Sequence, residues 1–237
     1  MSRIFQAHLE ILPAAQRQLW PELRPTLQLG FVLYGGTAVA LRLGHRSSVD
    51  FDFFTDQSLD RIAIRTAFPF LARSQVLQDQ SDTFTVIVPR GDSDDHPVKV
   101  SFFGTIGFGR VGEPALTHDG VLQVASPDDL VSTKLKVLLQ RVEAKDYQDI
   151  AALIKAGVSL EAGLAAAREM FGHSFQPSES LKALVYFEGG DLDSLARSER
   201  ETLIKAVNVV RKLPTVKILA HGLSAYSARG SPLGKDL

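Results

Sequence analysis

The segment 31–54 constrains the fold more than any other part of the chain. Its apolar start, residues 31–34, predicts a buried strand that ends in the pair Gly35-Gly36, and a helix then begins at Thr37. Glycine suits this strand-to-helix turn because it lets a phosphate approach the backbone N–H groups that open the helix. The segment therefore predicts a sheet with a phosphate-binding turn at the end of one strand.

The next predicted strand, residues 49–54, carries Asp50 and Asp52 two positions apart. Side chains alternate along a strand, so these carboxylates share one face while Phe51 and Phe53 share the other. Paired carboxylates repel each other unless a cation lies between them, and oxygen ligands favour a hard divalent ion. We expect Asp50 and Asp52 to bind Mg²⁺, with Mn²⁺ as the alternative ion. The simpler interpretation is a solvated strand face.

The composition fits an enzyme but does not identify its reaction. The chain has 237 residues, of which 45% are hydrophobic, so one or two domains can bury a substantial core. The absence of cysteine excludes disulfides, thiolate zinc sites and cysteine nucleophiles. A net charge of -1 gives no global basic field for nucleic acid. Because we find neither a signal peptide nor an apolar stretch of about 18 residues, we expect a cytoplasmic protein with no membrane partner.

The hydrophobic periodicity changes near residue 125. Before this point it predicts a mixture of strands and helices, and after it almost only helices. The expected helices of the first part are 5–23, 37–43 and 57–70, and the expected strands are 31–34, 49–54, 83–88, 98–103 and 121–124. We therefore expect an α+β fold with a small mixed sheet, divided into domains at 1–125 and 126–225, and a poorly ordered tail at 226–237.

A helix predicted after Ser126 separates two lysines. Lys134 falls on an apolar stripe with Leu130 and Leu138, whereas Lys136 falls on the polar stripe and is expected to be solvated. A lysine on an apolar face needs an anionic partner, because burial of an unpaired ammonium is costly. A nucleotide phosphate at the domain junction and a structural carboxylate are both compatible with this position.

Acidic residues follow on the next helical stretch. Asp146 falls on or near the buried face and Asp149 nearer its edge, which makes both candidates for a functional role. The structural alternatives are local: Lys145 and Asp149 are spaced for an i,i+4 ion pair, and Asp146 can cap a helix that breaks near Ala144.

Taken together, two blocks of residues resemble the AbiEii/AbiGii toxin family of nucleotidyltransferases, a branch of the polymerase-β-like nucleotidyltransferase superfamily. The first block comprises Gly35-Gly36-Thr37-Ala38, Arg42, Arg46, Ser48 and Asp50-Phe51-Asp52. The second comprises Asp129-Leu130, Lys134, Arg141, Lys145-Asp146 and Asp149. The resemblance covers about two thirds of the chain, and its specificity comes from the order and spacing of both blocks.

The resemblance implies an N-terminal polymerase-β-like nucleotidyltransferase domain completed by a helical C-terminal region. It implies transfer of a nucleoside monophosphate from an NTP to an acceptor hydroxyl. The implied catalytic residues are Asp50, Asp52, Lys134 and Asp146, with Lys145 and Asp149 in support. The implied nucleotide and phosphate ligands are Gly35, Gly36, Thr37, Arg42, Arg46 and Ser48. Salt bridges to nearby acids are the alternative for the two arginines.

The same resemblance implies a toxin that works with a separate antitoxin protein, as in toxin–antitoxin and abortive-infection systems, and tRNA as the acceptor of some members. A basic region from Lys205 through Arg211, Lys212 and Lys217 to Arg229 is a candidate RNA contact. The solvated side of a last helix explains the same charges.

One position departs from the superfamily pattern. Many polymerase-β-like enzymes carry a third carboxylate on the strand that here spans 98–103, and Ser101 takes its place. Three possibilities remain open: a two-carboxylate metal site, a base supplied by Asp146, or nucleotide binding without transfer. The rival functions are transfer to a small molecule or a protein, for which the acidic loop with Asp92, Asp94 and Asp95 is weak support, and a degenerate nucleotide-binding module.

Overall fold

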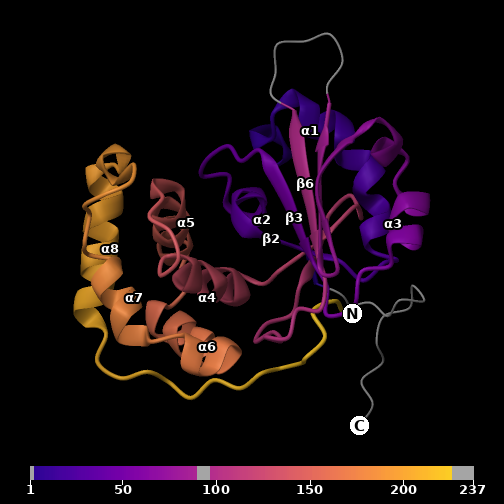
Figure 1. Ribbon diagram of the computed structural model, residues 1–237. Helices are drawn as coiled ribbons and strands as arrows, with labels where there is room; N and C mark the ends of the chain where they lie inside the picture. Colours follow the sequence, from indigo (N-terminus) through magenta and orange to yellow (C-terminus); the bar gives the residue numbers. More distant parts are fainter. Residues whose placement is uncertain (1–2, 90–96, 226–237) are drawn as a thin grey trace. The chain divides into compact units, whose positions relative to one another are not determined.

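The computed structural model describes residues 3–89 and 97–225 (Figure 1). The tail predicted at 226–237 and the acidic loop 90–96 lie outside these residues. The described chain is α+β, as expected, and forms two compact units. The sheet unit contains residues 3–89, 97–109, 113–125 and 220–225, and the helical unit contains 110–112 and 126–219.

The sheet unit is built on one mixed sheet. Within the described residues its strand order is β1-β7-β8-β2-β3-β6-β5-β4. The strands are β1 (Arg3–Phe5), β2 (Val32–Tyr34), β3 (Asp50–Phe54), β4 (Gln75–Gln80), β5 (Thr83–Val88), β6 (Val98–Phe103), β7 (Ala115–Thr117) and β8 (Gln123–Val124). Strand β3 runs antiparallel to β2 on one side and parallel to β6 on the other, and Figure 1 shows these three side by side. The candidate carboxylates therefore lie in the middle of the sheet.

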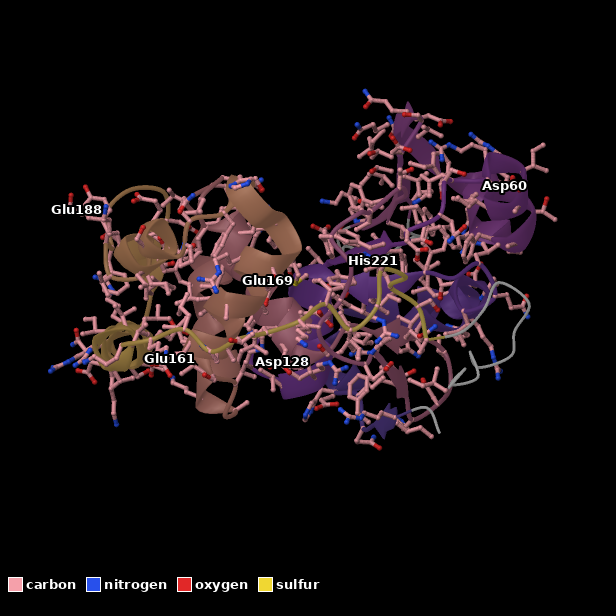
Figure 2. All side chains as sticks on the ribbon, turned by 90° about the horizontal axis from the view of Figure 1, so that it is seen from below. Asp60, Asp128, Glu161, Glu169, Glu188 and His221 are labelled. Carbon is pink, nitrogen blue, oxygen red and sulfur yellow. The ribbon has the colours of Figure 1, made fainter. Side chains whose placement is uncertain are left out.

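Helices and 3-10 turns surround the strands of this unit. They are η1 (Leu9–Ile11), α1 (Ala14–Leu19), η2 (Trp20–Thr26), α2 (Gly35–Leu43), α3 (Arg61–Ala67) and η3 (Pro69–Arg73). Asp60, labelled in Figure 2, caps α3 by accepting hydrogen bonds from the backbone N–H groups of Ile62 and Ala63, both 2.9 Å long. The long helices predicted at 5–23 and 57–70 are wrong in extent. Prolines interrupt both stretches, because proline lacks the N–H that continues a helix.

Aromatic side chains form the core on one face of the sheet. Phe51, Phe53 and Phe102 are fully buried, and the ring centroids of Phe53 and Phe102 lie 5.6 Å apart. Trp20, the only tryptophan of the sequence, packs beside Phe51 with a centroid distance of 6.2 Å. The alternation predicted for β3 is confirmed, because Asp50 and Asp52, which alternate with Phe51 and Phe53, are only partly buried. This core fixes which face the carboxylates take.

The helical unit begins with a capped helix, as the sequence predicts. The Ser126 hydroxyl accepts a hydrogen bond from the Asp129 backbone N–H at 3.1 Å, and Pro127 occupies the first helical position. The elements are α4 (Pro127–Val137), α5 (Ala144–Lys155), α6 (Leu160–Phe171), η4 (Gly172–Ser174), α7 (Pro177–Ala183), η5 (Leu192–Ser194) and α8 (Arg197–Val209). Glu161, labelled in Figure 2, accepts a hydrogen bond from the backbone N–H of Arg211 at 3.2 Å, which ties the segment after α8 to α6.

The last described residues return to the sheet unit instead of extending the helices. Leu223 is fully buried, and its backbone N–H donates to Asp56 Oδ1 at 3.1 Å. The amide of Gln123 donates to the Ser224 hydroxyl at 2.8 Å. The expected helical domain 126–225 therefore differs from the observed helical unit at its C-terminal end. None of the helices in the described part combines the length and hydrophobicity that a membrane span requires.

Candidate functional site

Asp50 and Asp52 form a carboxylate pair on the open face of β3. Their side chains alternate with the buried Phe51 and Phe53, so both carboxylates face the same side and stay partly exposed. The register pairs Asp52 with Tyr34 on β2. It also places each aspartate beside a residue of β6. The carboxylate pair predicted from the sequence is therefore present as a geometric unit.

The backbone of Gly35 lies against the carboxylate of Asp52. A Cβ atom built on Gly35 would lie 2.8 Å from Oδ2 of Asp52, closer than any side chain allows. The φ angle of Gly35 is +76°, in the left-handed region that favours glycine. Gly35 and Gly36 open α2 and are partly exposed, and no side chain of Tyr34 caps the helix start. The first backbone N–H groups of α2 thus begin beside the carboxylate pair.

Thr37 and Ser48 act within the protein. The Thr37 side chain is buried, donates a hydrogen bond to the backbone carbonyl of Asp50, and hydrogen-bonds the Ser48 hydroxyl at 2.9 Å. These contacts join the start of α2 to the start of β3. Their side chains therefore shape the turn, and the phosphate-binding role that the resemblance implies for them stays a prediction.

The two predicted arginines donate hydrogen bonds to backbone carbonyl groups. Arg42 donates through Nε to the carbonyl of Ala125 at 2.7 Å and through a terminal nitrogen to Val124 at 2.9 Å. Its guanidinium also lies over the ring of Phe5, 4.4 Å from the centroid. Arg46 donates to the carbonyl of Ser47 at 2.9 Å. Arg42 thus fastens α2 to neighbouring strands, which neither sequence interpretation anticipated.

Lys99 is the residue of this site that the sequence interpretation missed. Its ammonium Nζ lies 3.0 Å from Oδ2 of Asp50, and both side chains are about one third exposed. The parallel register of β3 and β6 brings the two residues together. The available sequence signal was the shared face of Lys99 and Ser101 on one predicted strand, but the pairing of that strand with β3 was not predicted.

Ser101 lies in register with Asp52 and is 2% exposed. On its other side β5 contributes Thr85, so a polar row crosses three adjacent strands. Ser101 therefore occupies the sheet position next to Asp52. The hydroxyl cannot supply the negative charge of a carboxylate at neutral pH.

The carboxylate pair fits a divalent metal ion that arrives with a nucleotide. Among the described residues no three His, Cys, Asp or Glu side chains gather into a metal-binding group. Mg²⁺ is commonly held by one or two carboxylates plus phosphate oxygens and water. The two partly exposed carboxylates of Asp50 and Asp52 match that requirement, and Gly35 places no side chain against Asp52.

In the helical unit, Lys134 forms the centre of a buried ion-pair cluster. Its Nζ lies 2.7 Å from Oδ1 of Asp146 and 2.6 Å from Oδ2 of Asp149, and the lysine side chain is 6% exposed. Arg141 donates to both carboxylate oxygens of Asp146, at 2.8 and 3.2 Å. Lys145 lies 2.8 Å from Glu143 and does not form the i,i+4 pair with Asp149 that was the structural alternative. The buried position predicted for Lys134 is therefore correct.

The environment of Asp146 keeps it ionised. Burial by itself raises the pKa of this carboxyl, but the hydrogen bonds from Arg141 and the charge of Lys134 outweigh burial and hold the pKa below its usual range. Asp146 is fully buried, and its carboxylate pairs with Lys134 and Arg141. Its predicted role as a base, and that of Lys134 at phosphate, stay predictions. Lys136 donates to the carbonyl of Ser174.

The exposed basic residues near the C-terminus have a different setting from the one expected. Helix α8 ends at Val209, so Arg211, Lys212 and Lys217 lie on the non-helical segment that follows it. Arg229, the last member of the predicted basic region, lies outside the described residues. The charges of this segment are solvated, and its role in RNA binding stays a prediction.

Solved structures share this fold. An antigenic nucleotidyltransferase-like protein from Paracoccidioides brasiliensis aligns with a TM-score of 0.51 and 16% identity, over 86% of this chain and 94% of its own. MenT4, a nucleotidyltransferase toxin from Mycobacterium tuberculosis H37Rv, aligns with a TM-score of 0.53 and 15% identity, over 84% of this chain and 91% of its own. At such identities the likeness concerns the fold.

Sequence comparison reaches further. An uncharacterized protein of Aquifex aeolicus (strain VF5) is 30% identical over 161 residues, which cover 67% of this chain and 74% of the relative. The family model described as nucleotidyl transferase AbiEii toxin, type IV toxin–antitoxin system, matches residues 20–219 and so includes both blocks of site residues. The chain therefore belongs to the AbiEii family of nucleotidyltransferase toxins, and it is a nucleotidyltransferase.

Proposed function

We propose that this nucleotidyltransferase uses Mg²⁺ to transfer a nucleoside monophosphate from an NTP to a hydroxyl group of an RNA, with tRNA as the first acceptor to test. We further propose that it acts as a toxin restrained by a cognate antitoxin protein. The observation that carries the proposal is the pair Asp50 and Asp52 on one strand face, with the backbone of Gly35 lying against the Asp52 carboxylate. Family membership supports the toxin role.

The sheet unit supplies the groups that a triphosphate needs. The backbone N–H groups at the start of α2 point toward a bound phosphate, and the helix dipole favours its negative charge. Asp50 and Asp52 would hold the divalent ion. When bound, that ion neutralises charge on the triphosphate and polarises the reacting phosphoryl group. Arg42 and the side chain of Thr37 are left out of the nucleotide site, because both are engaged within the sheet unit.

The chemical step is an in-line displacement. The acceptor hydroxyl oxygen forms a bond to the α-phosphorus, the bond between the α-phosphorus and its bridging oxygen breaks, and pyrophosphate leaves with that electron pair. The hydroxyl proton passes to solvent, because the described site offers Ser101 where a third carboxylate would act as a base. A hydroxyl beside Asp52 predicts slow transfer, and it favours the nucleotide-binding module as the alternative function.

The experiment incubates purified protein and Mg²⁺ with each α-labelled NTP and total tRNA. We expect label on RNA for the wild type and at least a hundredfold less for Asp52→Asn, which removes one carboxylate charge while keeping the side-chain shape. Label on protein or on a small molecule would identify another acceptor class. Bound but untransferred nucleotide would contradict the transfer reaction and support the binding module.

A further inference from the structure

The sheet face that carries the carboxylate pair continues into an aromatic row. Strand register places the side chains of neighbouring strands side by side, and residues two positions apart on one strand share a face. The row that contains Asp52 is therefore followed, about 6.6 Å further along the strands, by Phe54 on β3, Phe103 on β6 and Thr83 on β5. The carboxylates and the two rings thus lie on one face of the sheet unit.

The rings of this row differ from the rings of the core. Phe51, Phe53 and Phe102, on the opposite face of the sheet, are fully buried, whereas Phe54 and Phe103 stay partly exposed. The centroids of Phe54 and Phe103 lie 5.1 Å apart, and their planes meet at 77°. Contiguous apolar surface that remains exposed beside polar side chains is typical of ligand-binding sites.

Phe54 is held in place by rings of other segments. It stacks on Tyr34 with a centroid distance of 5.0 Å and an interplanar angle of 14°. The ring of Phe108 lies 6.3 Å from it on another side. Because Tyr34 is buried, this packing fixes Phe54, and Phe54 in turn supports Phe103. A surface that is already ordered loses little conformational entropy when a ligand binds to it.

The phosphate-binding turn and the aromatic row lie toward opposite ends of the carboxylate pair. Strand β2 runs antiparallel to β3 and pairs Tyr34 with Asp52, so it leads toward the Asp50 end of β3 as it reaches Gly35. Phe54 lies two residues beyond Asp52 in the other direction. A nucleoside triphosphate has the same order of groups, because its ribose separates the phosphates from the base. The order along the sheet is therefore phosphates, metal ligands and base.

We propose that Phe54 and Phe103 form the surface on which the base of the nucleotide stacks. The inference rests on the proposed function for the triphosphate and the metal ion, and it adds the residues that bind the base. Stacking of a base on an aromatic side chain tolerates any base, since every base has a π face. The two phenylalanine side chains carry no hydrogen-bonding group, so they bind the base without distinguishing its polar edges.

Calorimetric titration in the presence of Mg²⁺ separates base stacking from phosphate binding. The ligands are the α,β-methylene analogues of the four NTPs, which carry a base, and inorganic tripolyphosphate, which does not. The variant is Phe103→Leu, because Phe54 also packs against Tyr34 and Phe108. We expect it to lower the affinity for each analogue that binds by about tenfold and to leave the affinity for tripolyphosphate unchanged.

Phe187→Leu is the matched control. It replaces a partly exposed phenylalanine of the helical unit that also packs against another ring, with its centroid 6.4 Å from that of Tyr147, and it should change neither affinity. Equal losses for the analogues and tripolyphosphate in Phe103→Leu would show that the ring only supports the fold of the site. That result, or an unchanged affinity for the analogues, would overturn the proposal.

Proton NMR of the bound analogue gives a signature that a structural role of Phe103 would not produce. The ring current of a stacked phenylalanine shifts the base protons upfield, and at saturation this shift does not depend on affinity. We expect an upfield shift with the wild type and a smaller shift with Phe103→Leu. A bound analogue without an upfield shift would contradict the stacking and leave the proposed function standing. If the wild type binds neither the analogues nor tripolyphosphate, the proposed function fails and the base site fails with it.

Discussion

Gly35 shows how a single residue can control the site without contributing a side chain. An added methyl group would lie 2.8 Å from the Asp52 carboxylate, so Gly35→Ala must displace it. The left-handed φ adds a backbone cost of about 1–2 kcal/mol. We predict that Gly35→Ala lowers nucleotide transfer at least tenfold, as measured with labelled NTP, and weakens Mn²⁺ binding to the same degree.

Gly30 provides the matched control for this substitution. It has φ +72° in the same unit, and its added methyl group would meet only Thr55 Oγ1 at 3.9 Å. Gly30→Ala therefore carries the same backbone strain and leaves Asp52 in place. It should lose as much stability as the strain in Gly35→Ala accounts for, and its transfer activity should equal that of the wild type. Full transfer by Gly35→Ala would show that the Asp52 position is not critical.

At the scale of elements, the cluster that joins α4 to α5 determines the stability of the helical unit. Removing one partner of a buried ion pair leaves uncompensated charge and costs about 3–5 kcal/mol. We predict that Asp146→Asn lowers the free energy of unfolding by this amount at pH 7, as measured by urea unfolding and by hydrogen exchange of α5. Glu201→Gln, which breaks the exposed pair with Arg197, should change stability little.

The effect of Asp146→Asn should depend on pH with a defined sign. The folded pKa of Asp146 lies below its usual value, so the unfolded chain takes up the proton first, near pH 4. The stabilisation is therefore complete above about pH 4 and is lost as the pH falls toward the folded pKa. The difference in the free energy of unfolding between Asp146→Asn and the wild type should therefore be smaller at pH 3 than at pH 7. An equal difference at both pH values would mean that Asp146 is not held ionised. Lys134→Ala would break the same cluster, so its loss of activity alone would not identify a catalytic role.

The sequence predicts elements well where the signal is local. Strands β5 and β6 and the start of α4 agree with prediction because alternation and capping lie within each segment. Strands β1, β4 and β7 were not predicted: β4 is exposed along its whole length, and β1 and β7 have three residues each. The Lys99–Asp50 pair and the carbonyl contacts of Arg42 depend on which strands become neighbours, and one sequence does not carry that information.

At the scale of the whole molecule, the chain passes between its two units more than once. Residues 110–112 belong to the helical unit although they interrupt the sheet unit, and 220–225 return to the sheet unit after the helices. Asp129 attaches the segment 110–112 to the helical unit, because it accepts hydrogen bonds from the backbone N–H groups of Val111 and Gly112, at 2.7 and 3.3 Å. Dividing the chain at a single position therefore does not yield the two units, because each unit is formed from segments that are distant in sequence.

Leu223 tests this connectivity. Its side chain is fully buried in the sheet unit, so Leu223→Ala should destabilise that unit by about 2–5 kcal/mol, the usual cost of a core truncation. Trp20 reports the transition, because it is the only tryptophan and packs in the core of the same unit. His221→Ala, two residues earlier at an exposed position labelled in Figure 2, should leave the transition unchanged. If Leu223→Ala also leaves the Trp20 transition unchanged, the C-terminal segment does not stabilise the sheet, and the sheet unit would then have to be stable without residues 220–225.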